Sequence, residues 1–159
     1  MPEPPETSQE ERGLAARGDR QAPPGRVLGL DLGQARIGVA ISDPARRVAI
    51  PLGTVRTGPP QDLQTIGSLV REHQVVEVVV GLPLKLSGGR GQAAALAETF
   101  AEVLREAFGL PVSLQDERLS TVEADRGLKA AGASGRDRRR VVDRSAAAII
   151  LQAYLDRTR

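Results

Sequence analysis

The chain has 159 residues, a length that suits one domain with a single core. It contains no cysteine, which excludes disulfides and thiolate metal sites, and no apolar run approaches the roughly 20 residues that cross a membrane. Two phenylalanines and one tyrosine are its only aromatic residues and the formal net charge is +2, so base stacking is excluded as a main binding device and attraction to a polyanion is mild.

Residues 1–25 differ in composition from the rest of the chain. They contain five prolines and almost no large apolar residue beyond Leu14. Five acids and three bases give this segment a charge of −2, which leaves +4 for residues 26–159. Such a segment buries too little surface to offset the entropy of ordering, so we predict a disordered tail followed by one domain over residues 26–159. With no secretory signal, the chain is expected to be soluble and cytoplasmic.

Residues 27–42 predict a β-hairpin with a tight turn at residues 33–35. Because side chains alternate between the faces of a strand, the large apolar residues of both strands share one face, which we expect to be the core face. The opposite face carries one acid, Asp31, among small residues, namely Gly29, Gly38, Ala40 and Ser42. A carboxylate there is best tolerated beside a cation or hydrogen-bond donors, and the structural alternative is that Asp31 caps a turn.

The next segments predict a third strand, a helix and a buried strand. Residues 48–57 read as a strand in which Pro51 and Gly53 indicate an edge or a bulge. Residues 61–73 have apolar residues at helical spacing and end at His73, the only histidine, for which a surface role is expected. The β-branched run at residues 75–81 is typical of a parallel strand that is buried on both faces.

A glycine-rich loop and an amphipathic helix follow. The loop at residues 82–91 leaves a strand and opens a helix, as phosphate-cradling loops do, but it lacks a Gly-Lys-Ser/Thr motif. Lys85 and Arg90 either contact a nucleic-acid backbone there or belong to a solvated loop. Residues 92–108 predict a helix that ends before Gly109, with a core-facing stripe formed by Leu96, Phe100, Val103, Leu104 and Ala107.

Two adjacent acids end the strand predicted at residues 112–117. Alternation places Asp116 on the face of Val112 and Leu114, and Glu117 on the opposite, polar face. Glu117 is therefore the better candidate to approach Asp31, although a strand-end acid often only caps the next helix. A capping box at residues 120–123 already supplies that cap for a helix predicted to reach about residue 131.

The C-terminal part contains a basic run and a last helix. Arg136, Arg138, Arg139 and Arg140 surround one acid, and this run either neutralises phosphates or is a solvated segment. Val142, Ala146, Ile149 and Ala153 mark an amphipathic helix. Asp143 is expected in its first turn, where the helix dipole alone would favour a carboxylate.

Asp31, Glu117 and Asp143 thus come from three separate elements. Hard divalent cations prefer oxygen ligands, and Mg²⁺ needs only a few carboxylates when waters and substrate phosphates complete its shell. Two Mg²⁺ or Mn²⁺ ions, about 4 Å apart, would suit phosphodiester cleavage. Because the chain has no cysteine and one histidine, no thiolate or imidazole cluster competes with this interpretation.

Four motifs follow one another between Arg26 and Asp156. They are Leu28-Gly29-Leu30-Asp31-Leu32-Gly33 with Arg36-Ile37-Gly38-Val39-Ala40, then Val79-Val80-Gly81-Leu82-Pro83-Leu84, then Asp116-Glu117-Arg118-Leu119-Ser120-Thr121-Val122-Glu123-Ala124, and Val142-Asp143 leading into Ser145-Ala146-Ala147. In this order they resemble the YqgF/RuvX family of Holliday-junction resolvases, also described as nucleases that mature small-subunit ribosomal RNA. Two stretches depart from the pattern: residues 85–88 replace the commoner Asn-x-Asp/Ser-Gly, and Arg144 replaces a small residue.

The resemblance implies a fold, a site and a substrate class. The fold is ribonuclease H-like, with three antiparallel strands and then parallel βα units in a mixed five-stranded sheet flanked by helices. The acidic site falls on Asp31, Glu117 and Asp143, with Arg36 and Arg118 as backbone contacts. The implied substrate is structured DNA or an rRNA precursor, between which the sequence does not decide. Symmetric cutting of a junction would favour a homodimer, whereas RNA trimming would not need one.

Two other functional classes stay open at this stage. Related domains with decayed sites are non-catalytic nucleic-acid-binding or transcription modules, and the three acids argue against that reading. The segment Gly29-Leu30-Asp31-Leu32-Gly33 is also similar to the phosphate hairpin of actin-like and sugar-kinase ATPases. Those enzymes need two such domains, and this chain has the length of one.

Overall fold

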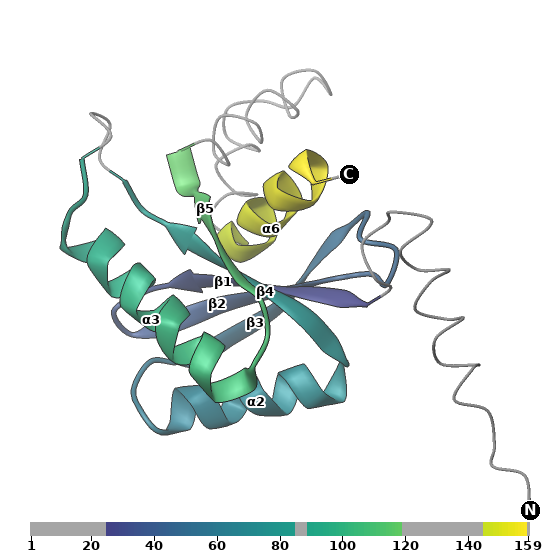
Figure 1. The fold of residues 1–159 in the computed structure, drawn as a ribbon, viewed down its shortest axis with the longest axis horizontal. Coiled ribbons are helices and arrows are strands. Elements are labelled where there is room, and N and C mark those ends of the chain that lie inside the picture. The colour runs from purple at the N-terminus through teal and green to yellow at the C-terminus, as the bar shows by residue number, and fades with distance from the viewer. Residues whose placement is uncertain (1–24, 85–88, 119–144, 159) are drawn as a thin grey trace, which may run out of the picture.

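A computed structural model describes residues 25–84, 89–118 and 145–158 (Figure 1). Their elements are, in chain order, β1 (Arg26–Leu32), β2 (Arg36–Ser42), β3 (Ala49–Arg56), α2 (Gln61–Glu72), β4 (Val75–Leu82), α3 (Gln92–Phe108), β5 (Val112–Asp116) and α6 (Ala146–Arg157). The predicted N-terminal tail, apart from Gly25, and the helix predicted at residues 120–131 lie outside the described residues. Among those described, no helix is long and apolar enough to cross a membrane.

The five strands form one mixed sheet in the order β3-β2-β1-β4-β5. Strands β1, β2 and β3 pair antiparallel, whereas β4 pairs in parallel with both β1 and β5. Helix α6 covers one face of the sheet, and α2 and α3 cover the other (Figure 1). This is the ribonuclease H-like arrangement that the family resemblance implies, and it puts β1 in the middle of the sheet.

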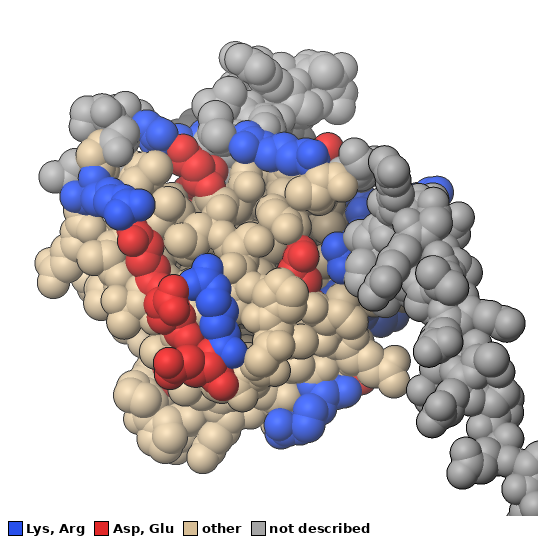
Figure 2. Space-filling model, viewed as in Figure 1, with Lys and Arg blue, Asp and Glu red and all other residues tan. Residues whose placement is uncertain are grey.

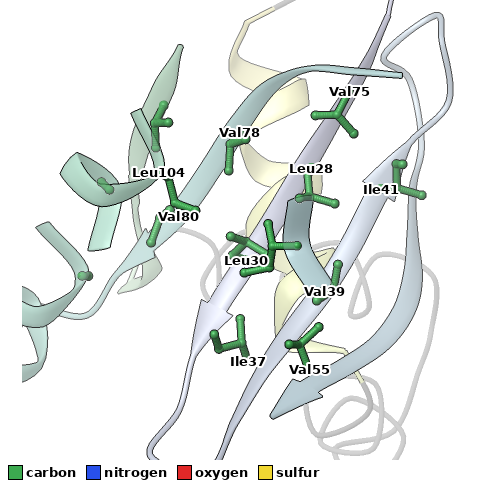
Figure 3. Close-up of a cluster of buried hydrophobic side chains, with 14 residues drawn as sticks. Leu28, Leu30, Ile37, Val39, Ile41, Val55, Val75, Val78, Val80 and Leu104 are labelled. Atoms are coloured by element: carbon green, nitrogen blue, oxygen red, sulfur yellow. The ribbon is translucent and has the colours of Figure 1, made fainter. Parts of the chain in front are cut away.

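Two separate apolar clusters confirm the predicted alternation in β1 and β2. Leu28 and Leu30 pack with Val78, Val80 and Leu104 on the face of α2 and α3 (Figure 3). The residues that alternate with them along the strands face α6 instead. They form a second cluster with residues of that helix, made of Val27, Ala40, Val79, Ala147, Ile150, Leu151 and Leu155. Strand β4 contributes to both clusters, which confirms that it is buried on both faces. Asp31 belongs to the α6 face.

Strand β3 is an edge strand with a bulge, as Pro51 and Gly53 predict. Its pairing with β2 shifts between Val39 and Ala40, which pair with Gly53 and Pro51. Leu52 is the extra residue, and Gly53 has a positive φ of 122°, which glycine adopts without strain. Beyond the bulge, Val55 joins the core of the α2 and α3 face. Because of the extra residue, the alternation of β3 shifts by one position, and this changes which residues beyond the bulge face α6.

Helix α3 has the predicted bounds. The predicted core stripe is confirmed for Leu104, which is buried, and for Phe100, which packs against the core, but it is wrong for the other three residues. Leu96 is 61% exposed and Val103 is 39% exposed, and Ala107 is also exposed. Besides Leu104, the helix buries three small residues, Ala94, Ala97 and Ala101. Alanines let the helix axis approach the sheet closely, so the larger apolar residues one position away end at the rim or in solvent.

Helix α6 approaches β1 closely because β1 has a glycine where they cross. A Cβ on Gly29 would lie 2.8 Å from the Cβ of Leu151 and 3.3 Å from the carbonyl oxygen of Ala147. The helix begins at Ala146, and the Ser145 side chain caps it by accepting a hydrogen bond from the Ala148 amide. Asp143 therefore precedes the helix, contrary to the prediction that it lies in the first turn, and it falls outside the described residues.

Candidate active site

Asp31 lies at the end of β1 among residues without bulky side chains. It pairs across the sheet with Gly38 of β2. A Cβ added to Gly38 would lie 3.6 Å from the Cβ of Asp31 and 3.5 Å from the Cβ of Ala147, near the start of α6. The carboxylate is thus placed between the sheet and the N-terminal end of α6, on a face that small residues keep open.

Glu117 follows β5 directly and reaches the same place from the other side of β1. Gly81 of β4 pairs with Gln115, two residues before Glu117. A Cβ added to Gly81 would lie only 2.5 Å from Oε1 of Glu117 and 2.7 Å from Cδ1 of Ile150. The Glu117 side chain therefore lies over the Gly81 backbone, in space that any other residue at this position would fill.

The two carboxyl groups interact directly, and this raises the pKa of Glu117. Burial, a side-chain hydrogen bond with Asp31 and the negative charges of Asp31 and Asp116 raise the pKa of Glu117 to about 7. A hydrogen bond between two carboxyl groups requires a proton on one of them. In the absence of a cation, Glu117 therefore keeps its proton to about pH 7 and donates it in the hydrogen bond to Asp31.

The raised pKa of Glu117 predicts that the metal-free protein becomes less stable as the pH rises from 5 to 8. The unfolded chain releases the Glu117 proton near the ordinary value of 4.5, whereas the folded chain keeps it to about 7. Stability from this group is therefore fully present below pH 4.5 and is lost as the pH passes through 7. Full linkage would amount to about 3 kcal/mol, and partial exposure of Glu117 reduces this to about 1–2 kcal/mol.

Urea unfolding in EDTA across this pH range measures the effect. The Glu117→Gln variant should lack this part of the pH dependence, whereas Glu72→Gln, at an exposed position of α2, should keep it. An equal slope in Glu117→Gln and in the unsubstituted protein would contradict the assignment.

Asp116 has a different partner from Glu117. Its Oδ1 accepts hydrogen bonds from the Arg118 amide at 3.0 Å and from Nε of Arg118 at 3.1 Å, and its Oδ2 accepts from Nη2 at 2.7 Å. These bonds hold the pKa of Asp116 below its ordinary value although the group is partly buried. Asp116 thus orients Arg118, and its charge adds to the field at Glu117.

The other predicted site residues fall into two groups. Arg36, at the start of β2, is exposed, and Arg90 is exposed with its Nε 3.3 Å from Oε1 of Glu98. The remainder lie outside the described residues, namely Lys85, Arg138, Arg139, Arg140 and Asp143. Among the described residues, no group of three or more histidines, cysteines or acids is placed to hold a metal ion, and Asp31 and Glu117 form a pair.

Gly81 is a site residue that the sequence reading did not single out. It ends the β-branched run of β4, and a glycine inside a strand pattern often marks a close approach of another group to the backbone. That signal was present in the sequence. The approaching group, Glu117, was visible only once β4 and β5 were paired.

The donor set at the pair suits a hard divalent cation. Two neighbouring carboxyl groups bring negative charge together at one place, and their oxygens are the ligands that Mg²⁺ and Mn²⁺ prefer. The chain has no cysteine, and its one histidine, His73, ends α2 on the opposite face of the sheet. A soft-metal site with thiolate or several imidazole ligands is thereby excluded for this chain.

Comparison with known proteins shows the family of this chain. A model of the RuvX family, described as Holliday junction resolvase, matches residues 25–157. A protein of Anaeromyxobacter dehalogenans strain 2CP-C, named "Putative pre-16S rRNA nuclease", is 50% identical over 133 residues, which cover 83% of this chain and 97% of that protein. A protein of the same name from Rhodococcus jostii strain RHA1 is 47% identical over 138 residues, which cover 83% of this chain and 78% of that protein.

Solved structures give a more distant likeness. The structure of T. thermophilus RuvC in complex with Holliday junction substrate aligns with 81% of this chain and 91% of that chain, at 14% identity and a TM-score of 0.49. The family assignment depends instead on the family model and on the close relatives, which agree over nearly the whole described domain. This chain therefore belongs to the RuvX family of nucleases.

Proposed function

We propose that this chain is a metal-dependent endonuclease that hydrolyses phosphodiester bonds in structured nucleic acid. The observation that carries the proposal is the pair of Asp31, in β1, and Glu117, which follows β5; their carboxyl groups are hydrogen-bonded on the α6 face of the sheet. Membership of a nuclease family supports the reaction class. Asp31, Glu117 and Asp143 are the proposed metal ligands and catalytic residues.

Asp143 is included because of its place in the chain. Ala147 lies against Gly38, beside Asp31, and Asp143 precedes Ala147 by four residues. Consecutive Cα atoms are about 3.8 Å apart, so the chain can bring Asp143 to the same cation. Its side chain would supply the third acid of a site that Asp31 and Glu117 begin.

The residues of the pair have distinct tasks in this proposal. Release of the Glu117 proton gives two carboxylates whose repulsion a divalent cation relieves. When bound, one or two Mg²⁺ or Mn²⁺ ions would supply an activated water and stabilise the leaving oxygen. Gly81 leaves room for the Glu117 side chain over the sheet, and the tight packing of α6 at Gly29 holds this face in place.

The family description and the names of the relatives point to different physiological substrates. The family description names Holliday junctions, and the close relatives are named for pre-16S rRNA. Chemistry directed at the backbone suits both, because phosphate contacts carry little sequence information. A homodimer is expected if the junction is the substrate, since two symmetric cuts need two active sites.

Metal dependence is the decisive test of the proposal. A labelled four-way DNA junction and a precursor of 16S rRNA are incubated side by side with the protein in Mg²⁺, Mn²⁺ or EDTA. We expect cleavage of at least one substrate in Mg²⁺ or Mn²⁺ and a loss of at least about a hundred-fold in EDTA. Cleavage that persists in EDTA, or binding without any cleavage in either metal, would overturn the assignment, and ATP turnover by the protein would point to the kinase-like alternative.

A further inference from the structure

A pocket opens at the edge of the sheet near Asp31 and is not used by the proposed metal site. It has a volume of about 280 Å³ and is lined by Ala35, Arg36, Thr54 and Arg56. These residues come from the turn after β1, the first residue of β2 and the end of β3. Hydrogen bonds from the Thr57 amide to the Ala35 carbonyl at 3.0 Å and from the Thr57 hydroxyl to the Gly33 carbonyl at 3.1 Å join the walls.

The strand register puts this pocket on the same face as Asp31. Asp31 pairs with Gly38, and Gly38 pairs with Thr54. Arg36 pairs with Arg56, two residues from Gly38 and Thr54, so both arginines share their face. Neighbouring strands lie about 4.8 Å apart, which places Thr54 roughly 10 Å from Asp31 along the sheet. The bulge at Leu52 is what turns Thr54 and Arg56 toward this face.

The pocket brings two positive charges close together. Arg36 and Arg56 are like charges directly opposite each other on neighbouring strands, a pairing that costs stability. No described carboxylate lies within ion-pair distance of either guanidinium, whereas Arg90, Arg105 and Arg118 pair with Glu98, Glu102 and Asp116. Figure 2 shows acidic and basic side chains next to one another over α3. An anion between Arg36 and Arg56 would remove the repulsion.

We propose that Arg36, Arg56 and Thr54 form a subsite for a backbone phosphate of the nucleic acid, next to the phosphate that is cleaved at Asp31 and Glu117. The inference rests on the proposed function for the neighbouring site. Two guanidinium groups supply forked donors for phosphate oxygens, and the Thr54 hydroxyl supplies a third donor. The chain's few aromatic residues do not line the pocket, which therefore recognises the phosphate rather than a base.

Binding without cleavage tests this subsite. Fluorescence anisotropy in EDTA measures the affinity of the labelled four-way junction and of the 16S rRNA precursor for each variant, on whichever ligand the unsubstituted protein binds more tightly. Arg56→Gln should weaken binding by about five- to thirty-fold and lower the slope of log K against log salt by about 1. Arg56→Lys should keep the salt slope but recover only part of the affinity, since it keeps the charge and loses the fork.

The matched control is Arg71→Gln, at an exposed arginine of α2 on the opposite face of the sheet. Thermal unfolding checks the fold, and Arg56→Gln should not lower the midpoint because it removes a repulsive pair. If Arg56→Gln binds as tightly as Arg71→Gln while the unsubstituted protein cleaves in Mg²⁺, the subsite is wrong and the nuclease proposal stands. If cleavage is absent but Arg56→Gln still weakens binding with the altered salt slope, the subsite stands and the nuclease proposal is wrong.

Discussion

Replacing Asp31 with asparagine is expected to reduce metal-dependent cleavage by at least about a hundred-fold. Asparagine keeps the size of the side chain but removes the negative charge that would bind the cation. Its partner Glu117 then has no adjacent carboxylate to share a cation with, so the pair no longer forms a divalent site. The measurement is single-turnover cleavage of the preferred substrate in Mg²⁺, with both proteins at the same concentration.

The fold of Asp31→Asn should survive, because the substitution relieves a repulsion instead of creating one. In EDTA at neutral pH we expect equal or greater stability than in the unsubstituted protein, with unchanged binding of nucleic acid. The matched control is Glu72→Gln, which replaces an acid by its neutral amide at an exposed position of α2. This variant should cleave normally. Undiminished cleavage by Asp31→Asn would show that another group performs the reaction.

The strands were predictable because their signals are local. Alternation in residues 27–42 separated the two faces of β1 and β2, and the β-branched run identified β4 as buried on both sides. Pro51 and Gly53 marked the edge strand and its bulge. In each case the side-chain pattern reports directly on the two faces of a strand, which later packing does not change.

Helix α3 was harder, because two large apolar residues of its predicted stripe are exposed and most of the residues that it buries are alanines. A periodicity argument weights Leu96 and Val103, whereas the packed face consists mainly of Ala94, Ala97 and Ala101. How closely a helix approaches a sheet depends on the partner surface, which the sequence of the helix alone does not contain. From the sequence of the helix alone, Leu96 is therefore expected in the core, although it is exposed in the structure.

The candidate site could likewise be predicted only in part from local sequence patterns. Alternation in β5 selected Glu117 over Asp116, and the structure brings Glu117 to Asp31 while Asp116 binds Arg118. The roles of Gly81 and Arg56 depend on neighbours from other strands, Glu117 and Arg36, whose register no single segment specifies. Long-range pairing is thus the part of the site that required the structure.

Gly81→Ala is expected to impair cleavage almost as strongly as Asp31→Asn, although it changes no charged group. The added Cβ would lie 2.5 Å from Oε1 of Glu117, so the carboxylate must leave its place beside Asp31. A displacement of about 1 Å in a catalytic group can cost roughly a hundred-fold in rate. The expected result is a cleavage rate lowered by about that factor, measured under single-turnover conditions in Mg²⁺.

Gly38→Ala is the matched control, since it adds the same methyl group on the same face of the sheet. Its Cβ would meet Asp31 and Ala147 at 3.6 and 3.5 Å, which is ordinary van der Waals contact. We expect it to cleave within a few-fold of the unsubstituted protein.

A second readout separates displacement of Glu117 from general damage to the fold. If Gly81 acts through Glu117, Gly81→Ala should also lose the fall in stability between pH 5 and 8 that the Glu117 proton produces in EDTA. Combining Gly81→Ala with Glu117→Gln should then cost little further activity, because both changes remove the same interaction. Additive losses in the double variant, or an unchanged pH dependence in Gly81→Ala, would mean that Gly81 serves only the packing of α6 through Ile150.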